Sequence, residues 1–88
     1  AISGTFDRVL VTENRVRIID FKSNQIVPTI PQQTPAGLLL QMGAYLRAAQ
    51  EIWSGKTVEV SILWTRTAAL MPLPHDLVTA AWEEGVGH

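Results

Sequence analysis

The sequence has no cysteine among its 88 residues. This absence excludes disulfide bonds, thiolate-based zinc sites and iron–sulfur clusters held by this chain. A reducing, cytoplasmic setting fits such a composition. No apolar run approaches the roughly 20 residues that a membrane-spanning helix needs, and no signal peptide is apparent, so we expect no membrane partner.

An excess of positive charge is also missing, because the formal net charge is −1. A free-standing nucleic-acid-binding domain is usually basic. The seven Lys and Arg residues are concentrated near the start of the chain, so the sequence predicts weak DNA affinity for this chain alone. Hydrophobic residues make up 47% of the chain, which is typical of a folded domain rather than a disordered segment.

The sequence alternates between strand-like and helix-like segments. Val, Ile and Phe are enriched in the strand-like segments, and Leu and Ala recur with helical spacing in the others. A long helix between the second and third strands fits a crossover connection. We therefore expect a mixed α+β (α/β) fold in the order β-β-α-β-β-α. The predicted strands cover about 2–12, 15–22, 57–65 and 68–72, and the predicted helices cover about 35–53 and 75–84.

The start of the long helix has its own signal. Thr34 is the predicted N-cap, and Pro35 occupies the predicted first helical position, where proline is well tolerated. Leu38, Tyr45 and Ile52 recur at seven-residue steps. This spacing predicts that they share the buried side of the helix.

Two aspartates and a lysine meet in the predicted hairpin formed by the first two strands. With a two-residue turn at Glu13 and Asn14, Asp7 lies directly opposite Asp20. Their Cβ atoms would be about 5 Å apart on one face of the sheet. Lys22 is two residues beyond Asp20 and points to the same face. The predicted hairpin therefore ends in two carboxylates and an ammonium beside apolar residues.

Two opposed carboxylates beside an apolar surface repel each other and are costly to desolvate. A divalent cation between them removes this cost. Oxygen ligands suit Mg²⁺, for which Mn²⁺ can substitute, and Mg²⁺ usually takes only one or two protein carboxylates. We predict Asp7, Asp20 and the backbone carbonyl of Phe21 as metal ligands. Lys22 would orient or help deprotonate a water, or stabilise charge on a phosphate, in hydrolysis of a phosphodiester.

The same residues have a plainer interpretation. Asp and Lys side chains on a strand commonly form solvated ion pairs that contribute little energy, and the chain would then be an ordinary α+β scaffold. The apolar pair Ile18-Ile19 precedes Asp20, and Phe21 lies between the two charged residues. These apolar neighbours favour a metal site over a solvated ion pair. The residues alone leave both interpretations open.

Three short motifs occur in order along the chain. Residues 4–8 (GTFDR) resemble the GxxDR motif of the RecB-like nucleases, within the PD-(D/E)XK superfamily. Residues 18–23 (IIDFKS) resemble the IIDYKT motif of that family, and residues 41–45 (QMGAY) resemble its QxxxY motif. The segment from Trp64 to Trp82 is similar to the C-terminal nuclease region of AddA-type helicase–nuclease subunits.

The resemblance implies a restriction-endonuclease-like core in which Asp7 and Asp20 bind metal and Lys22 is catalytic. It also implies that Gln41 and Tyr45 approach the site or the DNA strand. The implied activity is a Mg²⁺-dependent exonuclease that degrades DNA in double-strand break repair and recombination. The implied partners are an upstream ATP-dependent helicase domain of the same chain and a second helicase–nuclease subunit. No Walker-type motif occurs here, so we expect no ATP site in this segment.

The sequence departs from the family at its start. The family has a helix before the hairpin that supplies a further Glu or His, and this sequence begins after it. We therefore expect residues 1–88 to be a single fragment of a nuclease domain that lacks the N-terminal helix, is inactive in isolation, and favours dimerisation or an altered fold through its uncovered sheet. The alternative is a catalytically inactive nuclease-like module that binds DNA or a partner.

The remaining candidate residues have mainly structural interpretations. Arg8 should point to the sheet face opposite Asp7 and support the site from behind. Trp53, Trp64 and Trp82 could stack on bases, but their places in periodic apolar segments favour core packing. His75 opens the last helix, and we expect no metal role for it.

Overall fold

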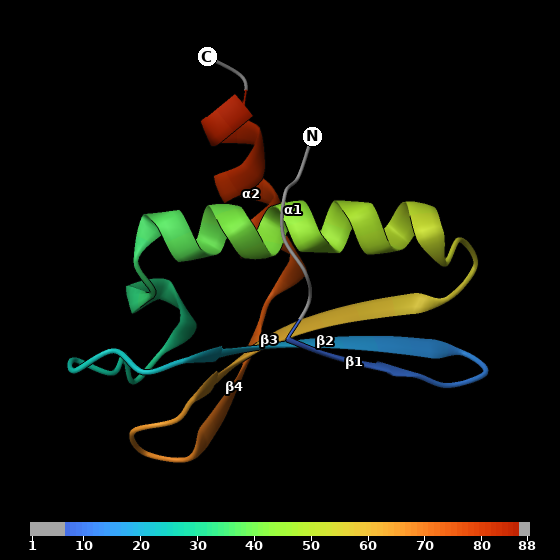
Figure 1. The fold of residues 1–88 in the computed structure, drawn as a ribbon. Coiled ribbons are helices and arrows are strands. Elements are labelled where there is room, and N and C mark those ends of the chain that lie inside the picture. Colours follow the sequence, from blue (N-terminus) through green and yellow to red (C-terminus); the bar gives the residue numbers. More distant parts are fainter. Residues whose placement is uncertain (1–6, 87–88) are drawn as a thin grey trace.

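The computed structural model describes residues 7–86, and its elements follow the predicted order (Figure 1). One four-stranded sheet forms a layer, and both helices lie on the same side of it. No helix in the described range has the length and apolarity needed to cross a membrane. The elements are β1 (Arg8–Val11), β2 (Arg15–Lys22), a 3₁₀ helix (Pro31–Gln33), α1 (Ala36–Ile52), β3 (Thr57–Trp64), β4 (Ala69–Leu73) and α2 (His75–Val86).

The β1–β2 hairpin has the predicted register. Val11 pairs with Val16, and this pairing leaves Glu13 and Asn14 as the turn. The Thr12 N–H donates to the Arg15 carbonyl across the turn, at 2.8 Å. The predicted register is therefore confirmed for β1. Residues 2–6 of the predicted first strand, with the start of the GTFDR motif, lie outside the described residues.

The carboxyl ends of β2 and β3 lie at the same edge of the sheet. The two strands are parallel, and Lys22 pairs with Trp64. β4 returns antiparallel to β3, which completes the strand order β1-β2-β3-β4. The loop of residues 23–35 and the turn of residues 65–68 consequently leave from the same edge. Thr65 fastens this edge, because its N–H and hydroxyl donate to the Lys22 carbonyl at 2.9 and 3.2 Å.

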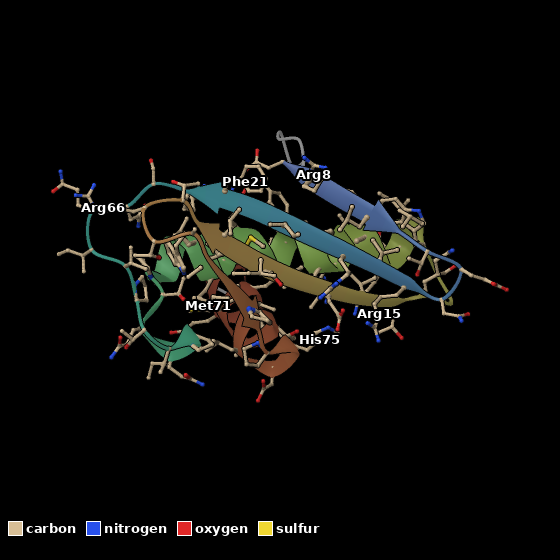
Figure 2. All side chains as sticks on the ribbon, turned by 90° about the horizontal axis from the view of Figure 1, so that it is seen from below. Arg8, Arg15, Phe21, Arg66, Met71 and His75 are labelled. Carbon is tan, nitrogen blue, oxygen red and sulfur yellow. The ribbon has the colours of Figure 1, made fainter. Side chains whose placement is uncertain are left out.

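The core lies between the sheet and the helices. Alternate residues of β2 and β3 point toward α1, and burying each large aliphatic side chain contributes about 1.5–3 kcal/mol. The face away from the helices is open in the described part of the chain and carries exposed apolar side chains beside arginines (Figure 2). The side chains with at most 2% exposure include Val16, Ile18, Met42, Leu46, Ala49, Val58, Val60, Ile62, Trp64 and Val78.

Two expectations about α1 were wrong. The helix begins at Ala36 with Pro35 as N-cap, because Thr34 instead ends the preceding 3₁₀ turn and donates its N–H to Pro31. The Thr34 side chain makes no capping hydrogen bond and is buried. Ile52 does not belong to the buried side, since it is 63% exposed in the last turn of the helix. Trp53, just beyond it, packs against the core instead.

Gly43 permits the close contact between α1 and α2. A Cβ at this position would overlap the Val78 carbonyl oxygen and lie 2.8 Å from the Trp82 Cβ. We expect Gly43→Ala to lower the free energy of unfolding by about 1–3 kcal/mol, because the overlap forces the helices apart. Thermal or urea unfolding measures this change.

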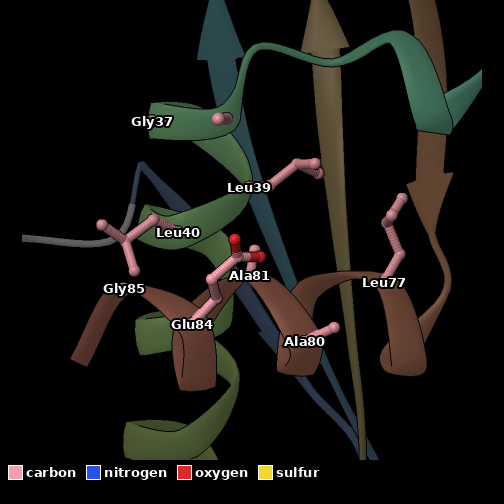
Figure 3. A pocket seen from close by; sticks show the side chains of 9 residues that line it. Gly37, Leu39, Leu40, Leu77, Ala80, Ala81, Glu84 and Gly85 are labelled. Atoms are coloured by element: carbon pink, nitrogen blue, oxygen red, sulfur yellow. The ribbon is translucent and has the colours of Figure 1, made fainter. Parts of the chain in front are cut away.

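Gly37 provides the matched control on the same helix. It lies at the rim of the groove between the helices (Figure 3), where an added Cβ meets no atom within 4 Å. Gly37→Ala should therefore raise stability by up to about 1 kcal/mol through helix propensity alone. Equal effects of the two substitutions would contradict the proposed role of Gly43.

Candidate active site

Asp7 is held by the backbone of β2. It precedes the first residue of β1, and its Oδ2 accepts a hydrogen bond from the Phe21 N–H at 2.9 Å. This contact continues the hairpin by one residue beyond the last β1 pair, Arg8 with Ile19. The carboxylate of Asp7 therefore lies beside Asp20, as the register predicted, and its side chain is exposed to solvent.

Asp20 is a buried carboxylate at the end of an apolar row. The alternation of β2 puts it on the same face as Val16 and Ile18, toward α1, and only 3% of it is exposed. Its Oδ2 lies 3.0 Å from Lys22 Nζ, which makes an ion pair. That oxygen nevertheless accepts no well-aligned hydrogen bond within residues 7–86. A buried acceptor thus keeps capacity for a further cation.

The two carboxylates have opposite pKa shifts. Hydrogen bonding to Asp20 is the main cause that lowers the pKa of Asp7, and the Phe21 N–H adds to it. Burial is the main cause that raises the pKa of Asp20, and the hydrogen bond with Asp7 raises it further, against the opposing effect of Lys22. Of the two carboxyls, Asp20 is therefore the one that loses its proton at the higher pH.

The Phe21 carbonyl lies on the β1 side of β2. The carbonyls of Asn14 and Lys22 face β3, where they accept hydrogen bonds from Thr57 and Thr65 at 2.9 Å each. Backbone groups alternate along a strand, so those of Phe21 face the other way, where its N–H meets Asp7. The Phe21 ring points to the open face of the sheet and is 41% exposed.

This donor set fits Mg²⁺. No three His, Cys, Asp or Glu side chains gather as a metal-binding group within residues 7–86. Two carboxylates and a backbone carbonyl suit a small hard cation, which commonly retains several waters and takes one or two protein carboxylates. The buried Oδ2 of Asp20, which accepts no well-aligned hydrogen bond in the described part of the chain, supports this fit.

The other predicted site residues are placed separately. On α1, Gln41 Nε2 donates to the Tyr45 hydroxyl at 2.8 Å, and Tyr45 belongs to the hydrophobic core. Arg8 is exposed and pairs in register with Ile19, on the sheet face away from the helices (Figure 2). The structure therefore brings Asp7, Asp20 and Lys22 together, links Gln41 to Tyr45 as a second pair, and leaves Arg8 behind the sheet.

One supporting residue was not predicted. Thr65 fixes the Lys22 carbonyl with both its N–H and its hydroxyl, and so holds the end of the strand that carries Asp20 and Lys22. A hydroxyl residue directly after a buried strand was its signal in the sequence. The signal can be interpreted only once β2 and β3 are known to be parallel, since the contact joins residues 43 positions apart.

Comparison with known proteins agrees with the geometry. A family model described as the PD-(D/E)XK nuclease superfamily matches residues 1–82. No curated protein and no solved structure matches the chain. Proteins of this superfamily are typically nucleases that hydrolyse phosphodiester bonds of nucleic acids, generally with divalent metal ions. The chain belongs to the PD-(D/E)XK nuclease superfamily.

Proposed function

We propose that Asp7, Asp20 and Lys22 form the active site of a Mg²⁺-dependent DNA nuclease. The observation that carries this proposal is the geometry of the hairpin end. There the buried carboxylate of Asp20 lies beside a second carboxylate. Its Oδ2 is 3.0 Å from the Lys22 ammonium and accepts no well-aligned hydrogen bond from any described residue. A surface ion pair has no need of such burial, and the second carboxylate makes the burial more costly without a cation.

Asp7, Asp20 and the Phe21 carbonyl would hold Mg²⁺, and Mn²⁺ would substitute for it. The bound ion would stabilise the charge that develops on the phosphate and lower the pKa of a bound water. With the ion balancing the charge of Asp20, the Lys22 ammonium would be available to orient the attacking water or to stabilise the phosphate oxygens.

We propose further that the chain is a RecB-like module, residues 1–88 being a single fragment of the C-terminal nuclease region of an AddA-type helicase–nuclease. The ordered motifs at 4–8, 18–23 and 41–45 support this proposal. In that setting the module is a cytoplasmic exonuclease that acts on DNA during break repair. It works with a helicase domain upstream and a second subunit. Gln41 and Tyr45 then support the site or the strand, and Arg8 supports the sheet.

The second candidate is a nuclease-like module that binds DNA or a partner without cleaving it. The observation that favours it is the small donor set, because only two carboxylates meet at the hairpin end within the described residues. Metal binding separates the two candidates, since only the nuclease requires it.

Titration of the full-length protein with Mn²⁺, followed by calorimetry, tests the proposed function. We expect one binding site whose affinity falls by at least about tenfold in Asp7→Asn, because a charged ligand becomes neutral. DNA cleavage should be lost in the same variant.

Asp76→Asn is the matched control for this titration. Asp76 is an exposed aspartate in the first turn of α2, far along the chain from the hairpin. It should leave Mn²⁺ affinity and cleavage unchanged. Wild-type affinity in Asp7→Asn would refute the metal site, and absence of Mn²⁺ binding by the wild-type protein would favour the inactive module.

A further inference from the structure

A pocket lies in the loop that follows the candidate active site. The loop of residues 23–35 starts directly after Lys22, and it lines an open, solvent-facing pocket of about 490 Å³. That size falls within the range of about 300–1,000 Å³ of small-ligand sites. Asn24, two residues beyond Lys22, is part of the wall, so at most about 7 Å of chain separates the pocket wall from the ammonium-bearing residue.

The wall of this pocket combines amides with apolar side chains and carries no charge. No Asp, Glu, Lys or Arg occurs between residues 23 and 35. Such a lining suits a nucleobase, whose flat faces are apolar and whose edges exchange neutral hydrogen bonds. A phosphate or a charged peptide would find no counterion here. The lining side chains include Asn24, Gln25, Ile26, Val27, Pro28 and Gln33.

Hydrogen bonds from Thr29 orient the side-chain amide of Gln33 and leave its NH₂ group as a donor. The Thr29 N–H and hydroxyl both donate to Gln33 Oε1, at 3.4 and 3.2 Å. A backbone N–H can only donate, so this oxygen is the acceptor and the amide NH₂ remains as a donor. Every nucleobase carries an acceptor on its edge, and an oriented donor therefore fits a base without selecting one.

Ile26 and Val27 are neighbours in the loop but have different environments. Val27 packs against the hydrophobic core and anchors the loop, whereas Ile26 is 88% exposed beside the pocket. A large aliphatic side chain that is almost fully exposed contributes nothing to folding. It can contribute to binding by packing on the face of a base.

A cation is available at the same edge of the sheet. Arg66 follows Thr65, which bonds to the Lys22 carbonyl, so the turn of residues 65–68 adjoins the start of the loop (Figure 2). Arg66 is exposed, and the ion pairs found within residues 7–86 involve other side chains. Its guanidinium is therefore available for a backbone phosphate.

We propose that this loop pocket binds an unpaired base of the substrate strand, next to the phosphodiester at the metal site, and that Arg66 contacts a neighbouring phosphate. The proposal rests on the proposed nuclease function and specifies its substrate as single-stranded at the cleaved position. Ile26 packs on the base, Gln33 donates to its edge, and the amides of the wall contribute further neutral contacts.

Binding of a short oligothymidylate and of an abasic strand of equal length tests the base pocket. The full-length protein is titrated in EDTA, without cleavage, and fluorescence anisotropy is recorded. The wild-type protein should prefer the strand with bases by about tenfold, since stacking of one base contributes about 1–3 kcal/mol. Ile26→Ala should lose most of this preference and bind the abasic strand as the wild type does.

Ile30→Ala is the matched control, because Ile30 is a 47% exposed isoleucine of the same loop that does not line the pocket. It should keep the wild-type preference. An unchanged preference in Ile26→Ala would overturn the pocket while leaving the nuclease proposal intact. Absence of Mg²⁺-dependent cleavage in the wild-type protein, with the base preference present, would overturn the nuclease and leave the pocket. Unfolding curves should be the same for both variants.

The salt dependence of binding tests Arg66. Arg66→Ala should reduce the slope of log affinity against log salt concentration by about 0.7, the value for one phosphate contact on a single strand. Arg47→Ala removes an exposed arginine from α1 and should leave the slope unchanged. Equal slopes for the wild type and Arg66→Ala would overturn the phosphate contact.

Discussion

Asp20→Asn should make the metal-free protein more stable and at the same time abolish DNA cleavage. Asp20 is 3% exposed, and burial raises the pKa of its carboxyl, so the charged form is unfavourable in the folded state. Asparagine has the same shape without the charge, and its amide can still donate to Asp7. The Lys22 ammonium that loses its partner is partly exposed and can be solvated, so we expect a gain of about 1–2 kcal/mol at neutral pH, which corresponds to roughly 5 °C or more in the melting temperature.

The gain should depend on pH in a defined direction. A carboxyl whose pKa is higher when folded favours folding at low pH, and this contribution disappears as pH rises through the folded pKa. For Asp20 the loss occurs above the ordinary value of 3.8. The advantage of Asp20→Asn over the wild type should therefore be small near pH 3 and grow toward neutral pH. The pKa of Asp7 is lowered, so its stabilising contribution is present above 3.8 and is lost as pH falls.

Mg²⁺ should make the wild-type protein more stable than Asp20→Asn, which reverses the order expected without metal. A ligand that binds only the folded state stabilises it by mass action, so the wild-type protein gains stability with Mg²⁺ concentration. Asp20→Asn lacks a charged ligand and should gain little. Glu13→Gln, in the turn of the same hairpin, is the control and should follow the wild type with and without Mg²⁺. A metal-free Asp20→Asn protein that is less stable than the wild type at neutral pH would mean that Asp20 is a structural ion-pair partner.

The hairpin was predictable because its information is local. A two-residue turn fixes the register of both strands, and a register with period two fixes the face of every side chain. The pairing of Val11 with Val16 follows from the turn at Glu13 and Asn14, and the apolar alternation of the second strand predicts that Val16 and Ile18 share the buried face. The approach of Asp7 to Asp20 was predictable for the same reason.

Other features depend on contacts between segments that are distant in sequence. Thr34 is the exception, because a local contact, the hydrogen bond from its N–H to Pro31 in the preceding 3₁₀ turn, places it before the helix. Ile52 continues the helical spacing, but the buried stripe of α1 ends near Ala49. The support that Thr65 gives to Lys22 requires β2 and β3 to be parallel neighbours. Local pattern cannot predict such contacts, because each depends on which element packs alongside.

Lys22→Ala should reduce the rate of DNA cleavage by about 10²–10³-fold, as expected for loss of one positioned charge at a phosphoryl centre. Mn²⁺ affinity should be retained or rise slightly, because Lys22 Nζ lies 3.0 Å from a proposed metal ligand and competes with the ion for Asp20. A purely structural lysine would give the opposite result, with weakened folding and unchanged turnover of the folded protein. Steady-state kinetics and calorimetry on the full-length protein measure the two quantities separately.

Two further variants define what Lys22 does. Lys22→Arg keeps the positive charge, but a guanidinium cannot be deprotonated in a protein, so activity in this variant would assign Lys22 to electrostatic stabilisation rather than proton transfer. Lys56→Ala removes an ammonium that bonds to the Thr12 and Glu13 carbonyls at 2.6 and 3.0 Å. It should lower stability without changing turnover. If Lys22→Ala cleaves DNA at the wild-type rate, the ammonium at the hairpin end is an ion-pair partner of Asp20, and the catalytic group must be sought elsewhere in the protein.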